Sequence, residues 1–489
     1  MQSAKGELVD TDRTLASVVE ISRQFLRSVR IDADFGREDA LSGYVCQGTA
    51  QALLESMARQ LTETKQRAFT WTGPYGGGKS SLALMLCSLV GPNAKLRSKA
   101  HEILDLPANS SVHKAFEARG QGWLVVPVVG KRASASGEIA AALALAKGDP
   151  YPKSRRKPVD TIAELVEAAN HHRQGVLLVI DELGKFLEAS SQEGGDDIYF
   201  FQELAEAASR AEGKLVVVGV LHQAFEAYAA RLGREARDEW AKVQGRFIDI
   251  PLVSATDELI ELIGRAIKVD ASVDCKPAGT IVEVVARAIR ARRPGAPTGI
   301  EAGLTRCWPL HPVTAALLGP ISRRRFSQNE RSTFGFLASR EPLGFVEFLE
   351  SEPAHWEAMY GPARFWDFLR ANLEPAILAS GDAHRWATAT EAVERAEAKG
   401  EQRHVDLTKV VALIEMFRNG SGLMPEASVL TVAVPGCTEA EVRDALRQLT
   451  EWKILIERKH LGAFGVYAGS DFDIEGAISR PLKYWRAAP

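Results

Sequence analysis

The sequence lacks three features that would point to particular classes of protein. Its 489 residues include five cysteines, which are scattered and show no C-x-x-C spacing, and this argues against a disulfide framework or a zinc site. The formal net charge of −3 at pH 7 gives no overall attraction to nucleic acid or to an anionic membrane. No apolar run is long enough to span a bilayer, and residues 1–13 are polar, without a secretory segment. These absences predict a cytoplasmic protein with no membrane partner, and the length predicts two to four domains.

The stretch GPYGGGKS at residues 73–80 matches the phosphate-binding pattern G-x-x-x-x-G-K-[ST] at every fixed position. Glycines let the backbone curl so that several N–H groups point at a phosphate chain. Lys79 supplies a positive charge near the β and γ phosphates of ATP, and the Ser80 hydroxyl can ligate Mg²⁺. A predicted strand precedes the loop and an apolar helix follows it, which is the setting that this motif requires. The residues predicted to bind the nucleotide here are Gly73, Pro74, Tyr75, Gly76, Gly77, Gly78, Lys79, Ser80 and Ser81.

A second motif follows a buried strand further along the chain. Residues 176–180, VLLVI, run directly into Asp181 and Glu182. Two adjacent carboxylates at the end of an apolar strand have no structural purpose there, but they are the arrangement that ATPases use beside a phosphate-binding loop. We expect Asp181 to hold Mg²⁺ together with Ser80, and Glu182 to act as the general base on the attacking water.

The remaining pattern predicts the fold class. Near-continuous apolar runs at residues 123–129, 215–221 and 248–252 are typical of parallel strands that are buried on both faces. Together with the phosphate-binding loop they predict an α/β P-loop NTPase core, in which helices flank a parallel sheet. From Thr256 onward the periodicity is helical, which predicts an all-α lid behind the core.

The two ends of the chain also have recognisable patterns. Residues up to about Arg30 carry an apolar face at helical spacing and predict an amphipathic helix. The last part predicts a winged helix, because two helices are followed by two short strands around the turn His460-Leu461-Gly462. The predicted domains are an N-terminal helical segment at 1–45, a nucleotide-binding core at 46–255, a helical lid at 256–350, a helical connector at 351–404 and a winged-helix domain at 405–489.

With these motifs the chain resembles AAA+ ATPases of the origin-recognition and STAND-like kind, which have a core, a lid and a winged helix. Three stretches, LLVIDELGKFLE at 177–188, PLHP at 309–312 and FSQNERS at 326–332, are similar to the large ATPases of prokaryotic phage-defence systems, such as the BREX ATPase components. This narrower resemblance implies an ATP-driven subunit that acts with partner proteins on foreign DNA. Such proteins are often longer, so an effector region is expected to be absent here or supplied by another polypeptide.

The resemblance also implies roles for residues outside the two motifs. Tyr44 and Val45 precede the first strand, where they are expected to contact the adenine base or, equally, to pack the entry helix. His222 and Gln223 end a strand at a place where ring-forming ATPases have a polar residue near the γ-phosphate or the lytic water. The alternative for both is a plain hydrogen-bonded strand end.

Two arginines complete the expected site. Arg246 lies between a predicted helix and the fifth strand, where AAA+ proteins have a finger that reaches the nucleotide of a neighbouring subunit; an interdomain salt bridge is the alternative. In the lid, Arg331 is the first candidate, and Arg325 the second, for closing over the phosphates. A DNA-facing role for the run Arg323–Arg325 is the alternative there.

Together these features predict an ATPase that binds ATP and Mg²⁺ and acts as a switch or motor in a DNA-linked complex, with a role in anti-phage defence. The predicted partners are further copies of the same chain, an effector or nuclease protein, and DNA through the winged helix. A different hypothesis is a slow ATPase that assembles with ATP and recruits an effector without binding DNA itself. DNA-stimulated hydrolysis would favour the first, and DNA-indifferent turnover with ATP-dependent assembly would favour the second.

Overall fold

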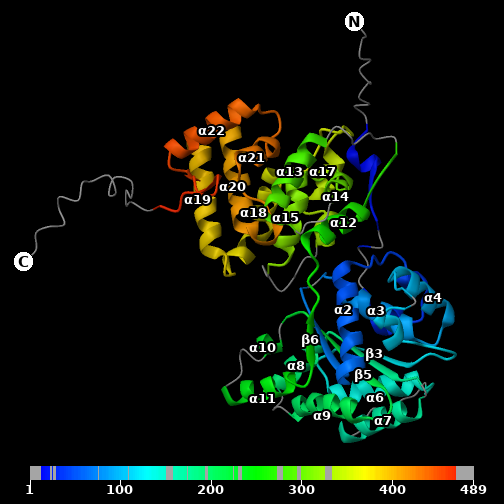
Figure 1. The fold of residues 1–489 in the computed structure, drawn as a ribbon. Helices are drawn as coiled ribbons and strands as arrows, with labels where there is room; N and C mark the ends of the chain where they lie inside the picture. The colour runs from blue at the N-terminus through cyan, green and yellow to red at the C-terminus, as the bar shows by residue number, and fades with distance from the viewer. Residues whose placement is uncertain are drawn as a thin grey trace, which may run out of the picture. The chain divides into compact units, whose positions relative to one another are not determined.

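The computed structural model divides into two compact units, each described here by itself (Figure 1). The first, the nucleotide unit, comprises Glu20–Lys268 and Glu330–Ala338, and the second, the helical unit, comprises Met1–Val19, Val269–Asn329 and Ser339–Pro489. The five predicted domains are a finer division than these two units and stay a prediction. The structure describes residues 13–469 except 23–24, 26–28, 75, 108, 150–157, 173, 193–195, 224, 229–233, 272–278, 295–298 and 325–332.

The nucleotide unit is built around a parallel sheet of five strands in the order β3-β4-β5-β2-β6. The β4 and β5 strands are fully buried because every residue in them lies between two layers of helices. Their apolar, β-branched sequences suit such a position, as the sequence pattern predicts. The strands are β2 (Ala68–Thr72), β3 (Leu124–Val129), β4 (Val176–Asp181), β5 (Leu215–Leu221) and β6 (Ile248–Pro251).

Helices lie on both faces of the sheet (Figure 1), and successive strand residues pack in two different hydrophobic cores. Leu177 and Val179 of β4 pack in the core with α2 and α3, whereas Leu178 and Ile180 pack in the core with α6, α7 and α9. The helices of this unit are α1 (Ile31–Asp34), η3 (Asp39–Leu41), α2 (Gly48–Arg59), η4 (Gln60–Thr64), α3 (Lys79–Val90), α4 (Ala94–Ile103), α5 (Ser111–Ala115), α6 (Ala135–Ala146), α7 (Pro158–His171), α8 (Leu183–Gln192), α9 (Asp196–Arg210), α10 (Phe225–Tyr228), α11 (Arg234–Gln244), α12 (Thr256–Ala266) and α16 (Thr333–Ala338).

The amphipathic helix predicted up to Arg30 is wrong over the first residues that the structure describes. Leu15–Ser17 forms a single 3-10 turn, η1, and Val19–Ile21 forms strand β1. This strand pairs with β7, Ile267–Val269, in a separate two-stranded sheet. The run Val18-Val19-Glu20-Ile21 is rich in β-branched residues, and a strand partner far along the chain decides in favour of the extended form.

The final part of the helical unit ends in the predicted pair of strands, but three helices precede them instead of the two predicted, and the winged-helix assignment stays a prediction. Three helices, α20 (Gln402–Ser421), α21 (Ala427–Ala433) and α22 (Glu439–Glu451), lead into an antiparallel hairpin of β8 (Leu455–Arg458) and β9 (Ala463–Val466). Glu415 of α20 holds this hairpin, because its carboxylate accepts the Val466 N–H at 2.8 Å and pairs with Arg458. The other helices of this unit are α13 (Gly279–Arg292), α14 (Ile300–Arg306), α15 (Pro312–Ser322), α17 (Phe345–Ser351), α18 (Pro362–Leu378) and α19 (Ala383–Lys399).

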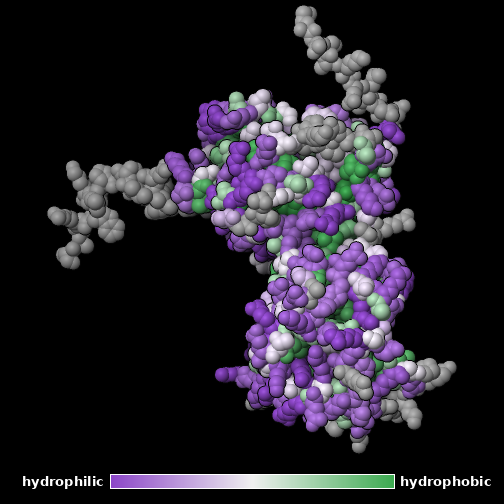
Figure 2. All heavy atoms as spheres, turned by 45° about the vertical axis from the view of Figure 1, so that its right-hand side comes forward, coloured by the Kyte–Doolittle hydropathy of each residue, from purple (hydrophilic) through white to green (hydrophobic). Residues whose placement is uncertain are grey.

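The described surface is mainly polar. On the face shown in Figure 2, hydrophilic side chains predominate over both units, with hydrophobic ones in scattered groups. None of the helices that the structure describes is both long enough and apolar enough to cross a membrane.

Candidate nucleotide site

The phosphate-binding motif forms the connection from β2 to α3 that its sequence predicts. Gly76 and Gly78 have positive φ angles of 71° and 76°, a backbone region that favours glycine. Gly73 is needed for a different reason, because a Cβ there would collide with the carbonyl oxygen of Leu252. The helix α3 then begins at Lys79, so its N-terminal amides border the loop. Tyr75 lies outside the described residues.

Lys79 is held inside this loop. Its side chain is buried, and its Nζ donates to the carbonyl oxygens of Gly73 at 2.7 Å and Pro74 at 2.6 Å. These two bonds bring the ammonium back over the curled backbone. The positive charge of Lys79 therefore lies next to the partial positive charge of the α3 N-terminus. Together these two charges favour the binding of an anion.

The carboxylate pair at the end of β4 lies next to the loop. Ser80, the second residue of α3, hydrogen-bonds to the Asp181 side chain. Burial raises the pKa of Asp181, whereas the bond from Ser80 and the charge of Lys79 lower it. A hydroxyl and a buried carboxylate in contact are the ligand types that Mg²⁺ prefers, so these two residues fit the predicted metal position.

Glu182 has an unusual backbone for a non-glycine residue. Its φ is +53°, in the left-handed region that costs an L-residue about 1–2 kcal/mol. Gly130, which follows the neighbouring strand β3, leaves room for the Glu182 backbone, because a Cβ at Gly130 would collide with the Glu182 carbonyl oxygen. The Glu182 side chain pairs with Lys185 on the first turn of α8 and is 30% exposed. Strain of this kind concentrates at functional positions because a well-packed fold otherwise avoids it.

His222 follows β5, the strand between β4 and β2, and therefore comes to the same edge of the sheet. Burial, together with the positive charges of Lys79 and Lys185, lowers its pKa to about 3. The electrostatic effect of Lys79 on His222 indicates that the imidazole lies on the side of the sheet where the phosphate-binding loop is. Gln223 follows it and is half-buried. What either side chain does toward a nucleotide stays a prediction.

Arg246 lies at the amino ends of the parallel strands, whereas the phosphate-binding loop lies at their carboxyl ends. It lies two residues before β6, which runs parallel to β2, whereas the phosphate-binding loop follows β2. Its guanidinium pairs with Glu206 of α9 at 3.2 Å and is 53% exposed. Arg246 is thus separated from the loop of its own chain by the length of a strand. The predicted finger role toward a neighbouring subunit stays a prediction.

The remaining predicted residues have less to connect them with a nucleotide. Tyr44 and Val45 are half-buried, and Tyr44 packs against the core on the α2 and α3 side of the sheet. Burial raises the pKa of the Tyr44 hydroxyl above its usual value. This packing is what the alternative interpretation expected, and base contact stays a prediction. Arg331 and Arg325 lie outside the described residues.

Two charged residues near the site belong to no motif that can be identified in the sequence. Arg30 forms a two-bond pair with Asp32, at 3.2 and 2.7 Å. Its pKa is raised mainly by that hydrogen bond and also by the charge of Glu182, which places Arg30 near the carboxylate pair. Asp249 of β6 accepts hydrogen bonds from Thr70, at 2.8 Å, and from Thr72, the last residue before the loop. Both come to the site through the fold.

Comparison with known proteins does not show which family the chain belongs to. No family model matches the chain, and no curated protein matches it. Among solved structures it is similar to the ORC2 protein of Aeropyrum pernix, in a structure titled as ADPNP-ADP complexes, with 12% sequence identity and a TM-score of 0.34. The match covers 89% of this chain and 95% of the other.

The fold is that of an α/β P-loop NTPase. That assignment rests on the five-stranded parallel sheet, the glycine loop from β2 to α3, and the carboxylate pair at the end of β4. The helical region that follows the core is also as predicted. The narrower resemblance to phage-defence ATPases receives no support from the comparisons and stays a prediction.

Proposed function

We propose that this protein binds and hydrolyses ATP. The observation that carries the proposal is the meeting of Lys79, Ser80, Asp181 and Glu182 at the edge of the sheet where β2 and β4 end. Open α/β sheets bind their ligands at this edge. Anion-binding groups are on one side of the site and carboxylates are on the other, which is the distribution of charge that a magnesium-bound triphosphate requires.

The binding step uses the loop and its lysine. The loop amides and the N-terminus of α3 attract the phosphates, and the Lys79 ammonium exchanges its two carbonyl acceptors for phosphate oxygens. Ser80 and Asp181 would hold Mg²⁺, which when bound neutralises charge on the phosphates. Because burial disfavours the charged form of Asp181, a cation beside it would relieve part of that cost.

The hydrolytic step needs a base for the attacking water. Glu182 directly follows Asp181, has a side chain that is accessible to solvent, and is oriented by Lys185. Its strained backbone turns it away from the regular continuation of β4. We assign Glu182 the role of taking the water proton, since a carboxylate beside the metal ligand is suitably placed to do so.

The direct test compares Asp181→Asn with Asp160→Asn, a matched change at an exposed position of α7. Binding of magnesium-ATP is followed by calorimetry, and phosphate release gives the rate of hydrolysis. We expect the wild type and D160N to bind and hydrolyse ATP, and D181N to lose magnesium-dependent hydrolysis. Absence of ATP binding by the wild type would contradict the proposal.

A second candidate function, the slow ATPase that recruits an effector, is favoured by the charges on α22. In a winged helix this helix is the one that can enter a DNA groove. Here Glu439, Glu441, Asp444 and Glu451 outnumber its two arginines, and both arginines pair with acidic residues of the same helix. DNA recognition relies on cations that are available for phosphates, so this helix is poorly suited to it.

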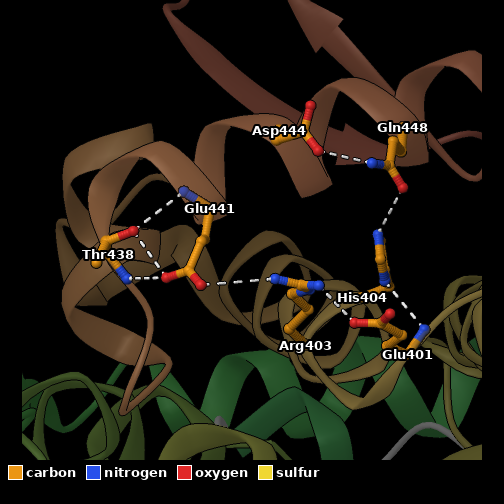
Figure 3. A network of polar contacts seen from close by, with 7 residues as sticks. All are labelled: Glu401, Arg403, His404, Thr438, Glu441, Asp444 and Gln448. Carbon is orange, nitrogen blue, oxygen red and sulfur yellow. Dashed lines mark hydrogen bonds and ion pairs between the residues drawn. The ribbon is translucent and has the colours of Figure 1, made fainter.

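The polar contacts between α22 and α20 are a second reason why α22 is poorly suited to DNA binding (Figure 3). Thr438 and Glu441 form a capping box at the start of α22, and Glu441 also pairs with Arg403 of α20 at 3.8 Å. Further along, Gln448 contacts the buried His404 ring at 3.1 Å. These side chains hold the two helices together and are therefore engaged within the unit.

The two functions differ in what ATP turnover responds to. A DNA-linked motor predicts hydrolysis that duplex DNA stimulates severalfold. A recruiting switch predicts turnover that ignores DNA, together with a larger particle in light scattering when ATP is added. We expect the second result from the charge distribution on α22.

A further inference from the structure

The segment that follows β6 borders the phosphate-binding loop. The Leu252 N–H donates to the Thr72 carbonyl oxygen at 2.8 Å, which extends the pairing of β6 with β2 up to the loop. The Leu252 carbonyl oxygen then packs directly on Gly73 and would lie 3.8 Å from a Cβ at Gly77. We call residues 252–258 the strap. Its first residue, Leu252, is therefore in contact with the phosphate-binding loop.

The other end of the strap is Glu258, on the first turn of α12. Its carboxylate accepts three hydrogen bonds, from the Thr49 N–H at 2.8 Å, the Thr49 hydroxyl at 2.7 Å and the Ala255 N–H at 3.0 Å. The Gln47 side chain adds a bond to the Glu258 carbonyl oxygen at 3.0 Å. Thr49 and Glu258 are 209 positions apart in the sequence.

Glu258 thereby caps two helices at once. The N-cap residue of α2, Gln47, makes no capping bond with its own side chain, and the Glu258 carboxylate takes that place from another element. The same carboxylate closes the first turn of α12 through Ala255. A negative charge shared between two helix N-termini is favoured by both helix dipoles, so this junction is held firmly.

We propose that Glu258 is a positioning residue that sets the affinity of the site for the nucleoside part of ATP. The inference rests on the proposed function. A triphosphate bound by the loop must project its nucleoside over a neighbouring surface, and the strap is such a surface. Through Glu258 the strap fixes residues 44–49, which include Tyr44, at the start of α2. The charge of Glu258 reaches Tyr44 and Cys46, which shows that these groups lie close together.

The test separates nucleoside from phosphate affinity by comparing ATP with inorganic tripolyphosphate, which has the phosphates alone. Calorimetry with magnesium is performed on the full chain, on Glu258→Gln, and on Thr49→Val, which removes the hydroxyl and keeps the Thr49 N–H bond. The control is Glu261→Gln, the same change one turn along α12 at a residue whose side chain is 45% exposed and pairs with Arg265. We expect E258Q to weaken ATP binding about tenfold, T49V to weaken it less, and E261Q to leave it unchanged. Tripolyphosphate affinity stays the same in all four proteins.

Two other results would overturn the inference. Equal weakening of ATP and tripolyphosphate in T49V, a variant that retains most of the junction, would show a general structural role. Unchanged ATP affinity in both T49V and E258Q would show that the junction does not border the nucleoside. If the wild type binds neither ligand, the proposed function fails first, and that outcome is distinct from the other two.

Discussion

The nucleotide site and the helix α22 use charged residues in opposite ways. Lys79 and Asp181 are each 3% exposed; Lys79 donates to backbone carbonyls, and Asp181 is hydrogen-bonded by the Ser80 hydroxyl and the Glu182 N–H. On α22, the side chains of Arg443 and Arg447 are 73% and 66% exposed and pair with acids of the same helix. Burying a charge is costly unless it is well partnered, whereas an exposed ion pair contributes little.

This difference in the burial of charged residues indicates which part of the molecule has a function that depends on charge. A buried charge of this kind persists because it does something that an apolar residue could not, so the loop and the carboxylate pair mark a site. Exposed charges that compensate each other, as on α22, can serve solubility alone. Single substitutions should therefore have large effects at the first place and small ones at the second.

The largest effect is expected from Glu182→Gln. The amide keeps the size of the side chain but cannot take a proton, so hydrolysis should fall by roughly 10²–10⁴-fold while ATP binding is retained. Phosphate release and calorimetry measure the two quantities. The matched control is Glu188→Gln on α8, the helix that follows Glu182, where the carboxylate is 44% exposed and near Arg132. Undiminished hydrolysis in E182Q would remove Glu182 from the mechanism.

The next effect is expected from Lys79→Met, which removes the buried ammonium. We expect ATP affinity to fall about 100-fold, because charge-assisted bonds to phosphate are lost. Lys95→Met is the control, since that lysine is 74% exposed and pairs with Glu38. Equal affinities of the two variants would mean that phosphate is bound elsewhere.

A smaller effect concerns the stability of the protein at acid pH. The unfolded His222 takes up a proton near pH 6.5, but the folded one does so only at about pH 3. In that window the unfolded chain binds more protons, so His222 lowers the free energy of unfolding as pH falls, by up to about 1.4 kcal/mol per pH unit. Above pH 6.5 this contribution vanishes. Urea unfolding of the wild type and His222→Asn across the window should give a shallower pH slope for the variant, and parallel slopes would contradict the assignment.

The smallest effect is expected from replacing Arg443 and Arg447 of α22 by glutamine. Exposed pairs contribute less than about 1 kcal/mol, so the free energy of unfolding should hardly change. DNA affinity and its salt dependence should not change either, since neither arginine is available for phosphates. A lower salt dependence in the double variant would show that α22 contacts DNA after all, and would favour the DNA-linked function.

Local pattern was sufficient for the central part of the fold. The strands of the sheet and the helix that begins at Lys79 form where the sequence predicts them. Each signal lies within a short stretch, and buried parallel strands need only a continuous apolar run. Val19–Ile21 show the limit of such patterns, because their apolar spacing suited a helix while the partner that makes them a strand lies at Ile267–Val269.

The sequence by itself therefore determined that a phosphate-binding loop and a carboxylate pair exist, since the residue types and their spacing lie in contiguous stretches. Only the tertiary structure decided what surrounds them. It brought Gly130 against Glu182, His222 near Lys79, and Glu258 onto Thr49. These contacts join residues on different elements, and no local periodicity encodes them. They arise because parallel strands end at one edge of the sheet, where the segments that follow them must pack together.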